Sequence, residues 1–286
     1  MKKHISQYLE YLRIEKGLSE KSIEVYQRDI LEFSHFIKNF SVSRLARSHI
    51  RGFLCFLAEK QNQPITRRRK LTSLKNYFAF LENENLIKNS PVKNVAMPKV
   101  KEKEPSYLTE QELKKLIKMV KEDKSRHQKR NKLMIRILIE TGIRISELTN
   151  LNIADADCES KMITVVRKGG QKQSVPINTE LANEIRKLAK GRNASEPLLV
   201  SSFRKRITQR RVGMLVQKYL KLAGIIKPNI SVHSLRHSFC SRLLEKGVNL
   251  KTIQILAGHK NISTTERYLH IAKSRLRKEV RLAEIH

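Results

Sequence analysis

Apolar residues recur at helical spacing through the first part of the chain. Positions three and four apart lie on one face of a helix, so such a pattern predicts amphipathic helices. Four stretches show it: HISQYLEYLRIEKG (4–17), SEKSIEVYQRDILEFSHFIKN (19–39), ARSHIRGFLCFLAEKQ (46–61) and PITRRRKLTSLKNYFAFLENENL (64–86). Ser19 suits the N-cap of the second helix, and Pro64 suits the first turn of the fourth. We expect the four helices to pack as a bundle.

The segment NSPVKNVAMPKVKEKEPS, residues 89–106, interrupts this pattern. It holds three prolines and alternating charges, with no sustained apolar period. Such a composition predicts an extended linker. We therefore expect a helical domain over 1–97, a linker over 98–106 and a larger domain over 107–286.

The pattern in the larger domain is mixed. Thr109 followed by Glu112 fits a helix capping box, and the apolar run of NKLMIRILIETGIRISELTNL stops at Gly142, which predicts a helix end. A further short helix is expected over 145–150. KMITVVRKGGQKQSVPI alternates in the manner of a strand around Gly169-Gly170, which predicts a hairpin.

Helices are expected again over 179–190 and 208–223, with a short strand at PLLV between them. The fold class is therefore mainly α, with a small β-hairpin or sheet. We find no internal repeat in the sequence.

The charge narrows the range of partners. The chain has 286 residues with 59 basic and 27 acidic side chains, a formal net charge of +32. A polyanion is the natural partner, because phosphate neutralisation supplies most non-specific affinity for nucleic acid. A ribosomal partner or an anionic membrane surface fits the charge equally well.

No apolar run approaches the roughly 18 residues of a membrane span, and no signal peptide is visible, so we expect a cytoplasmic, nucleoid-associated protein without membrane contact.

The three cysteines give neither a disulfide framework nor a zinc pattern, because they are few and widely spaced. Cys240 has a helix-core environment in SFCSRLL, which argues against a nucleophile.

Two dense basic runs are candidate contacts to the DNA backbone. The first stands at the start of the fourth helix, where cations oppose the helix macrodipole; a solvated helix face remains the alternative. The predicted contacts are Arg67, Arg68, Arg69, Lys70, Arg204, Lys205, Arg206, Arg210 and Arg211.

The C-terminal stretch 231–270 concentrates residue types that phosphodiester chemistry needs. His233 and Arg236 are three apart and share a helix face. Asn261 to Ser263 read as a turn and N-cap, which places Tyr268 on a short helix of its own.

The motifs HSLRH, LAGH and TTERY, with the earlier TGIRISEL and RKGGQ, resemble the signature of the tyrosine recombinase (phage integrase-like) family. The resemblance covers residues 108–272, and more weakly the N-terminal helices, which look like the family's core-binding domain. Ala257 in LAGH, where a second leucine is commoner, is a small departure.

The resemblance implies a role for each matching residue. Tyr268 is the nucleophile that forms a 3′-phosphotyrosyl bond, Lys168 the general acid to the leaving 5′-oxygen and His233 a general acid or base. Planar guanidiniums suit the non-bridging phosphate oxygens. The implied catalytic set is Arg144, Lys168, His233, Arg236, His259 and Tyr268, with His259 donating a hydrogen bond to phosphate and Glu147 as structural support. No cofactor and no metal ion are implied.

The resemblance also implies the partners. We expect duplex DNA with an inverted-repeat recombination site and a homo-tetramer on two sites, or assembly with a related recombinase. Strand exchange then passes through a Holliday junction, and a regulatory partner protein is compatible with this scheme. The family clamps DNA between its two domains. The tail AKSRLRKEVRLAEIH is amphipathic and either docks on a neighbouring protomer or packs locally.

The core-binding helices begin near residue 1, with no arm-binding domain before them. This favours an Xer-like recombinase that resolves chromosome or plasmid dimers, in chromosome partition and the cell cycle, over an integrase of a phage, virus or mobile element.

The competing classes are a type IB topoisomerase, a binding protein of this fold that no longer cuts DNA, and a metal-dependent nuclease. The last would need clustered carboxylates, and Asp155, Asp157 and Glu159 read as a turn without the frame of an EF-hand.

Overall fold

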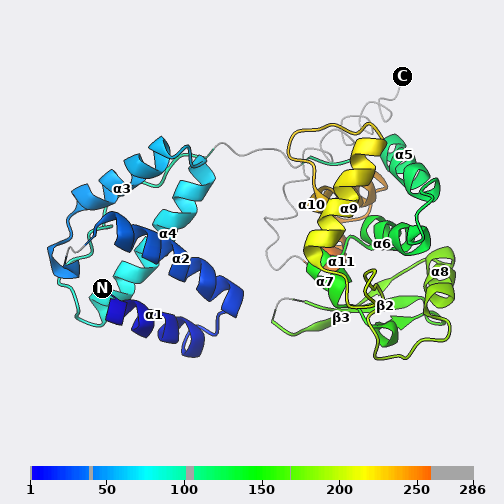
Figure 1. The fold of residues 1–286 in the computed structure, drawn as a ribbon, viewed down its shortest axis with the longest axis horizontal. Helices are drawn as coiled ribbons and strands as arrows, with labels where there is room; N and C mark the ends of the chain where they lie inside the picture. The colour runs from blue at the N-terminus through cyan, green and yellow to red at the C-terminus, as the bar shows by residue number, and fades with distance from the viewer. Residues whose placement is uncertain (1, 39–40, 101–105, 168, 259–286) are drawn as a thin grey trace, which may run out of the picture. The chain divides into compact units, whose positions relative to one another are not determined.

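The computed structural model describes residues 2–38, 41–100, 106–167 and 169–258. The chain divides into two compact units, residues 1–103 and 104–286 (Figure 1). Each unit has its own hydrophobic core.

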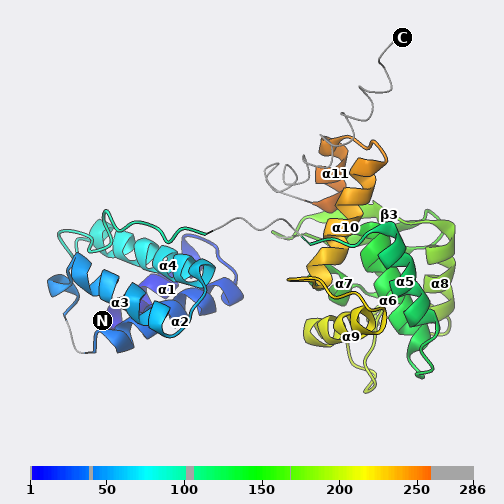
Figure 2. The same ribbon diagram turned by 90° about the horizontal axis from the view of Figure 1, so that it is seen from above.

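The N-terminal unit is a helical bundle, and all four predicted helices are confirmed (Figures 1 and 2). Its elements are α1 (Lys2–Ile14), α2 (Glu20–Phe36), the 3-10 turn η1 (Val42–Arg44), α3 (Arg47–Glu59) and α4 (Pro64–Asn83). Aromatic rings fill the centre: the Tyr8 and Tyr77 centroids are 5.3 Å apart, and all of Tyr8, Phe33 and Phe53 is buried. Such edge-on ring pairs add to the free energy of area burial alone.

The N-cap predicted for α2 is confirmed at Ser19, although its hydroxyl lies 3.0 Å from Ser22 Oγ and caps no backbone N–H. One local prediction in this unit needs correction. The segment 89–106 was expected to be extended throughout. Its first part instead forms a turn, in which Val92 and Val95 join the core of the bundle. Burial of two valines outweighs the extended preference of the neighbouring prolines.

The C-terminal unit packs helices around one small sheet. Its elements are α5 (Glu110–Lys121), α6 (Gln128–Thr141), α7 (Ile145–Asn150), η2 (Ile153–Asp155), β1 (Ala156–Asp157), β2 (Met162–Val166), β3 (Lys172–Pro176), α8 (Thr179–Ala189), α9 (Gln209–Leu222), α10 (Val232–Glu245) and α11 (Leu250–Ala257). α6 lies at the centre, against α5, α8 and α10, and ten of its residues are buried. The mainly α class is thereby confirmed. Among the described residues no helix is long and apolar enough to cross a membrane.

The start of α5 and the hairpin follow the sequence pattern closely. Glu112 N–H donates to Thr109 Oγ1, while Glu112 Oε2 accepts from Thr109 N–H, which is the predicted capping box. β2 and β3 pair antiparallel, with Val166 opposite Lys172. β1 extends the hairpin to an antiparallel three-stranded sheet.

The strand expected at PLLV is wrong. Residues 197–200 make only isolated bridges, from Pro197 to Asn152 and from Val200 to Arg206. The short apolar run is buried between loops, where Leu198 and Leu199 face the core, so burial without a partner strand explains its composition.

A carboxylate ties the α5–α6 connection to α9. Asp123 Oδ2 accepts hydrogen bonds from Tyr219 Oη at 2.5 Å and Ser125 Oγ at 2.6 Å. Burial alone would raise the pKa of Asp123, but these bonds and the nearby Lys218 ammonium outweigh it and lower the pKa to about 2. The ionised carboxyl therefore stabilises the folded unit.

We predict that Asp123→Asn lowers the free energy of unfolding by about 2 kcal/mol at neutral pH. The folded pKa is depressed, so this contribution is present above the ordinary value of 3.8 and is lost as pH falls toward about 2. Urea denaturation between pH 7 and pH 2 should therefore show wild type converging on the variant. A pH-independent difference would contradict the charge as its source.

Candidate functional site

The end of α6 places Arg144. Gly142 follows the helix with φ 62°, in the left-handed region, where L side chains are strained. A Cβ built at this position would lie 2.3 Å from Phe239 Cδ1, so only glycine fits. The chain turns here and re-enters a helix at Ile145, with Arg144 at the N-cap position of α7. The predicted helix stop and the predicted short helix are both confirmed.

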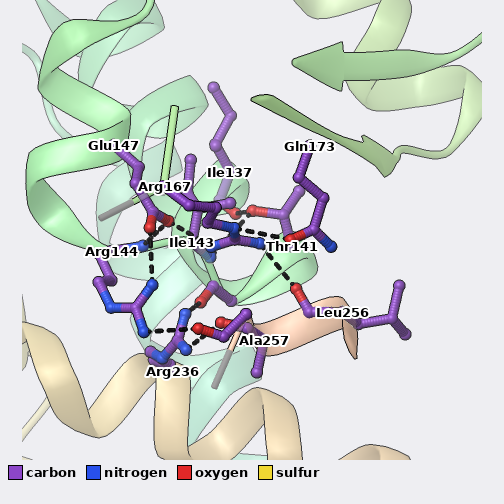
Figure 3. Close-up of polar contacts among 12 residues, drawn as sticks. Ile137, Thr141, Ile143, Arg144, Glu147, Arg167, Gln173, Arg236, Leu256 and Ala257 are labelled. Carbon is purple, nitrogen blue, oxygen red and sulfur yellow. Dashed lines mark hydrogen bonds and ion pairs between the residues drawn. The ribbon is translucent and has the colours of Figure 1, made fainter. Parts of the chain in front are cut away.

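Glu147 is a buried carboxylate shared by two arginines (Figure 3). Its Oε1 accepts from Arg144 Nη1 at 2.8 Å, and its Oε2 accepts from Arg167 Nη1 at 2.6 Å and from the Arg144 backbone N–H at 2.8 Å. Burial would raise the pKa of this carboxyl, but the hydrogen bonds from Arg144 and Arg167 outweigh burial and hold the pKa below its ordinary value. Glu147 is therefore ionised and fixes both guanidiniums.

The last turn of α11 is the second anchor. The final carbonyls of a helix lack intrahelical partners, and cations are favoured beside them. Side chains from three other elements satisfy four consecutive carbonyls here. Gln173 donates to Ile255 O, Arg167 to Leu256 O, Arg236 to Ala257 O and Arg144 to Gly258 O. Figure 3 shows the three guanidiniums converging on this turn.

Arg236 is the more buried of the two predicted catalytic arginines. It stands on α10 with 7% of its surface exposed, and its Nη1 donates to Gly142 O at 2.6 Å. Burial, with the nearby charge of Arg144, lowers its pKa to about 10. Arg236 thus stays protonated at neutral pH. Arg144 is 32% exposed, so the pair presents one buried and one accessible guanidinium.

The other predicted catalytic residues divide into two groups. His233 lies one turn before Arg236 on α10 and is exposed. Lys168, His259 and Tyr268 lie outside the described residues, as do the turn and N-cap expected at 261–263. The sheet turn beside position 168 is closed by Arg167, whose N–H donates to Gln171 O at 2.7 Å and whose carbonyl accepts from Gly170 N–H at 3.1 Å.

Sequence reasoning missed Arg167 and Gln173. A signal for Arg167 was present: Ile163 and Val165 are buried, and the period of two continues to position 167. An arginine on the buried face, directly before a candidate catalytic lysine, indicates a charged side chain that bonds to other residues of the site. For Gln173 no comparable signal exists, because its partner Ile255 O belongs to a distant helix.

The first basic run divides between the interior and solvent. Lys70 is 7% exposed and its Nζ lies 2.5 Å from Glu32 Oε2. Arg69 is paired with the buried Asp29. Arg67 is half-buried, whereas Arg68 is exposed. The opposed macrodipole is thus offset by carboxylates of α2.

The second basic run divides in the same way. Arg206 donates to Thr149 O at 2.9 Å and to Asn152 Oδ1 at 2.6 Å, so it ties its own segment to the end of α7 and the residues that follow it. The other four members are exposed, and they are Arg204, Lys205, Arg210 and Arg211.

The acidic cluster considered for a metal caps turns. Asp155 Oδ2 accepts from Asn152 N–H at 2.7 Å, and Asp157 Oδ1 accepts from the backbone N–H groups of Glu159 and Ser160. Within the described ranges no group of three or more His, Cys, Asp or Glu residues is arranged to hold a metal ion. Cys240 is buried in the core beside Phe239.

Comparison with known proteins defines the class. Residues 106–275 match the Phage integrase family, and residues 5–85 match the Phage integrase, N-terminal SAM-like domain. The chain therefore belongs to the phage integrase family of DNA strand-transferring enzymes.

Relatives at nearly full length narrow the class further. The chain is 33% identical to "Tyrosine recombinase XerC" of Thermodesulfovibrio yellowstonii, over 94% of this chain and 91% of that protein. It is 31% identical to "Tyrosine recombinase XerD" of Oceanobacillus iheyensis, over 96% and 95%. The chain is thus an Xer-like site-specific tyrosine recombinase.

Solved structures share the fold. The XerH recombinase bound to a palindromic difH substrate matches with TM-score 0.77 and 24% identity, over 98% of this chain and 85% of that one. The Tn1549 transposon integrase in complex with transposon right end DNA matches with TM-score 0.80 and 19% identity, over 97% and 99%.

We predict that Gly142→Ala destabilises the C-terminal unit by about 3 kcal/mol, the sum of left-handed strain and overpacking against Phe239. Gly191→Ala is the matched control: its φ is 75° and nothing lies within 4 Å of its Cβ position. Only left-handed strain applies to Gly191→Ala, so its free energy of unfolding should fall by only about 1 kcal/mol. Urea denaturation followed by circular dichroism measures both. Equal losses would show that Phe239 does not restrict position 142.

Proposed function

We propose that Tyr268 attacks a DNA phosphodiester between the guanidiniums of Arg144 and Arg236. A bond forms between the tyrosine oxygen and phosphorus, and the bond to the 5′-oxygen breaks, which leaves a 3′-phosphotyrosyl enzyme and a free 5′-hydroxyl. Attack by a 5′-hydroxyl of another strand reverses the step and releases Tyr268. The phosphodiester energy is conserved in the covalent link, so religation needs no outside energy source.

The observation that carries this proposal is the convergence of positive charge at the end of α11. Arg144, Arg167 and Arg236 are all anchored there, and Glu147 is the one carboxylate bonded to them in the described part of the chain. The protonated form of Arg236 is destabilised here, since burial and the charge of Arg144 lower its pKa. An incoming phosphate relieves this repulsion. The relief grows as charge develops on the pentacoordinate phosphorus, which is the condition for catalysis.

The remaining roles complete the proton balance. Lys168 donates a proton to the departing 5′-oxygen, and His233 takes the proton from Tyr268. His259 donates a hydrogen bond to a non-bridging oxygen. Glu147 orients Arg144 and stays ionised throughout, because the pKa of its carboxyl is depressed.

We propose that both units bind duplex DNA at an inverted-repeat site and that four protomers act on two sites, alone or with a related recombinase. The net charge of +32 supports a DNA partner, and similarity to proteins named XerC and XerD supports the resolution of chromosome or plasmid dimers. The protein then works on the nucleoid. Integration of a mobile element uses the same chemistry and is the second candidate, since the Tn1549 integrase shares the fold.

The nucleophile is tested with a pool of nicked duplexes of randomised sequence, incubated with the protein in EDTA. We predict an SDS-resistant protein–DNA adduct for wild type and for the control Tyr107→Phe. We predict none for Tyr268→Phe, because phenylalanine has no attacking oxygen. Sequencing the recovered DNA identifies the preferred site. An adduct that persists in Tyr268→Phe would overturn the assignment, and a pool recovered without sequence preference would favour a topoisomerase.

The exposed part of the second basic run is tested by salt dependence. Each lost phosphate contact reduces the slope of log affinity against log salt by about 0.9. We predict that Arg210→Ala combined with Arg211→Ala reduces the slope by about 2, measured by fluorescence anisotropy. Arg206→Ala should instead lower stability, because Arg206 bonds to carbonyls at the end of α7. A slope unchanged in the double variant would place these arginines off the DNA.

A further inference from the structure

Arg167 lies where the β2–β3 hairpin, α7 and α11 meet, and 7% of its side chain is exposed. Each end of its guanidinium is occupied. Nη1 donates to Glu147 Oε2 at 2.6 Å, Nε to Gln173 Oε1 at 2.9 Å and Nη2 to Leu256 O at 2.9 Å. The planar fork thus bonds to three elements at once and has little freedom to rotate.

The main chain of Arg167 closes the turn of the hairpin. Its N–H donates to Gln171 O and its carbonyl accepts from Gly170 N–H. Lys168 is its direct neighbour in the sequence. The residue that precedes the proposed general acid is therefore fixed twice, by its backbone within the turn and by its side chain to α7 and α11.

The contact between hairpin and α11 is tight. Gln173 adds a second link, from its Nε2 to Ile255 O at 2.8 Å. A Cβ at Gly258 would lie 2.6 Å from Arg167 Nε, and Gly258 has φ 63°, so position 258 admits no side chain without displacing the guanidinium. The hairpin and the end of α11 are thus built to fit each other.

We infer that Arg167 is a positioning residue that holds the turn bearing Lys168 in place relative to Arg144 and Arg236. We place it off the phosphate, because each of its three guanidinium nitrogens already donates within the protein, to Glu147, Gln173 and Leu256. The inference rests on the proposed function, in which Lys168 is the general acid. Loss of Arg167 then impairs proton delivery to the leaving oxygen more than it impairs DNA binding or attack by Tyr268.

A sulfur leaving group separates proton delivery from every other effect. The pKa of a thiol is about 8.5, whereas that of a hydroxyl leaving group is close to the value of about 15.7 for water. A departing thiolate therefore needs no proton, unlike a departing 5′-alkoxide. In DNA with sulfur at the bridging 5′ position, the phosphorus–sulfur bond breaks, the thiolate leaves and the phosphotyrosyl bond forms. A variant that lacks only the general acid should therefore recover on this DNA.

The experiment measures single-turnover adduct formation on the nicked duplex recovered from the randomised pool, made with oxygen or sulfur at the scissile 5′ position. Arg167→Met is compared with Gln173→Leu and with the control Ser174→Ala, an exposed residue of the same strand. Lys168→Ala and Tyr268→Phe test the proposed function in parallel. The oxygen-to-sulfur comparison is made within each variant, so it does not depend on the folded fraction.

We expect Arg167→Met to slow adduct formation about ten- to hundredfold on oxygen and less than about threefold on sulfur. The loss on oxygen is smaller than the roughly 10²–10⁴-fold contribution of a general acid, because the variant displaces Lys168 without removing it. Gln173→Leu should show a smaller loss on oxygen with the same recovery, and Ser174→Ala should match wild type on both. Equal loss on oxygen and sulfur for Arg167→Met, while Lys168→Ala recovers on sulfur, would overturn the inference alone. Failure of Lys168→Ala to recover would overturn the general-acid assignment and the inference with it.

Discussion

The charge of Glu147 is the interaction on which the site depends. Arg144 and Arg167 both bond to this buried carboxylate. Burial, together with the nearby charges of Arg144 and Arg167, lowers the pKa of Arg236. Bringing like charges into a region of low dielectric costs free energy unless an opposite charge and hydrogen-bond acceptors accompany them. Glu147 supplies the charge, and the last carbonyls of α11 supply the acceptors. The arrangement leaves excess positive charge, which suits an anionic substrate.

The fold serves this arrangement through close backbone approaches. Gly142 lets α6 end against Phe239 and presents its carbonyl to Arg236. Gly258 lets α11 end against Arg167. In both places a side chain would displace a ring or a guanidinium, so packing and charge are coupled. The arginines are held in place by the protein alone, which is the preorganisation that the proposed electrostatic stabilisation requires.

Much of this was predictable from sequence. Helical periodicity gave the bundle, the glycine at 142 gave the helix end, and the motif order placed Arg144 and Arg236 at one site. Contacts between distant segments were not predictable, because no local pattern encodes them. Gln173 meets Ile255 across 82 positions, and Lys70 meets Glu32 across 38. A charge run reads the same in sequence whether its members face solvent or a buried carboxylate.

The most direct test of the account is the single-turnover rate of adduct formation by Glu147→Gln on the selected nicked duplex. Glutamine keeps the shape but removes the charge shared by Arg144 and Arg167. Losing charge-assisted hydrogen bonds of about 1.5–3 kcal/mol predicts a rate about ten- to hundredfold lower, with DNA affinity within about twofold of wild type. A folded Glu147→Gln protein that forms the adduct at the wild-type rate would contradict the central role of this carboxylate.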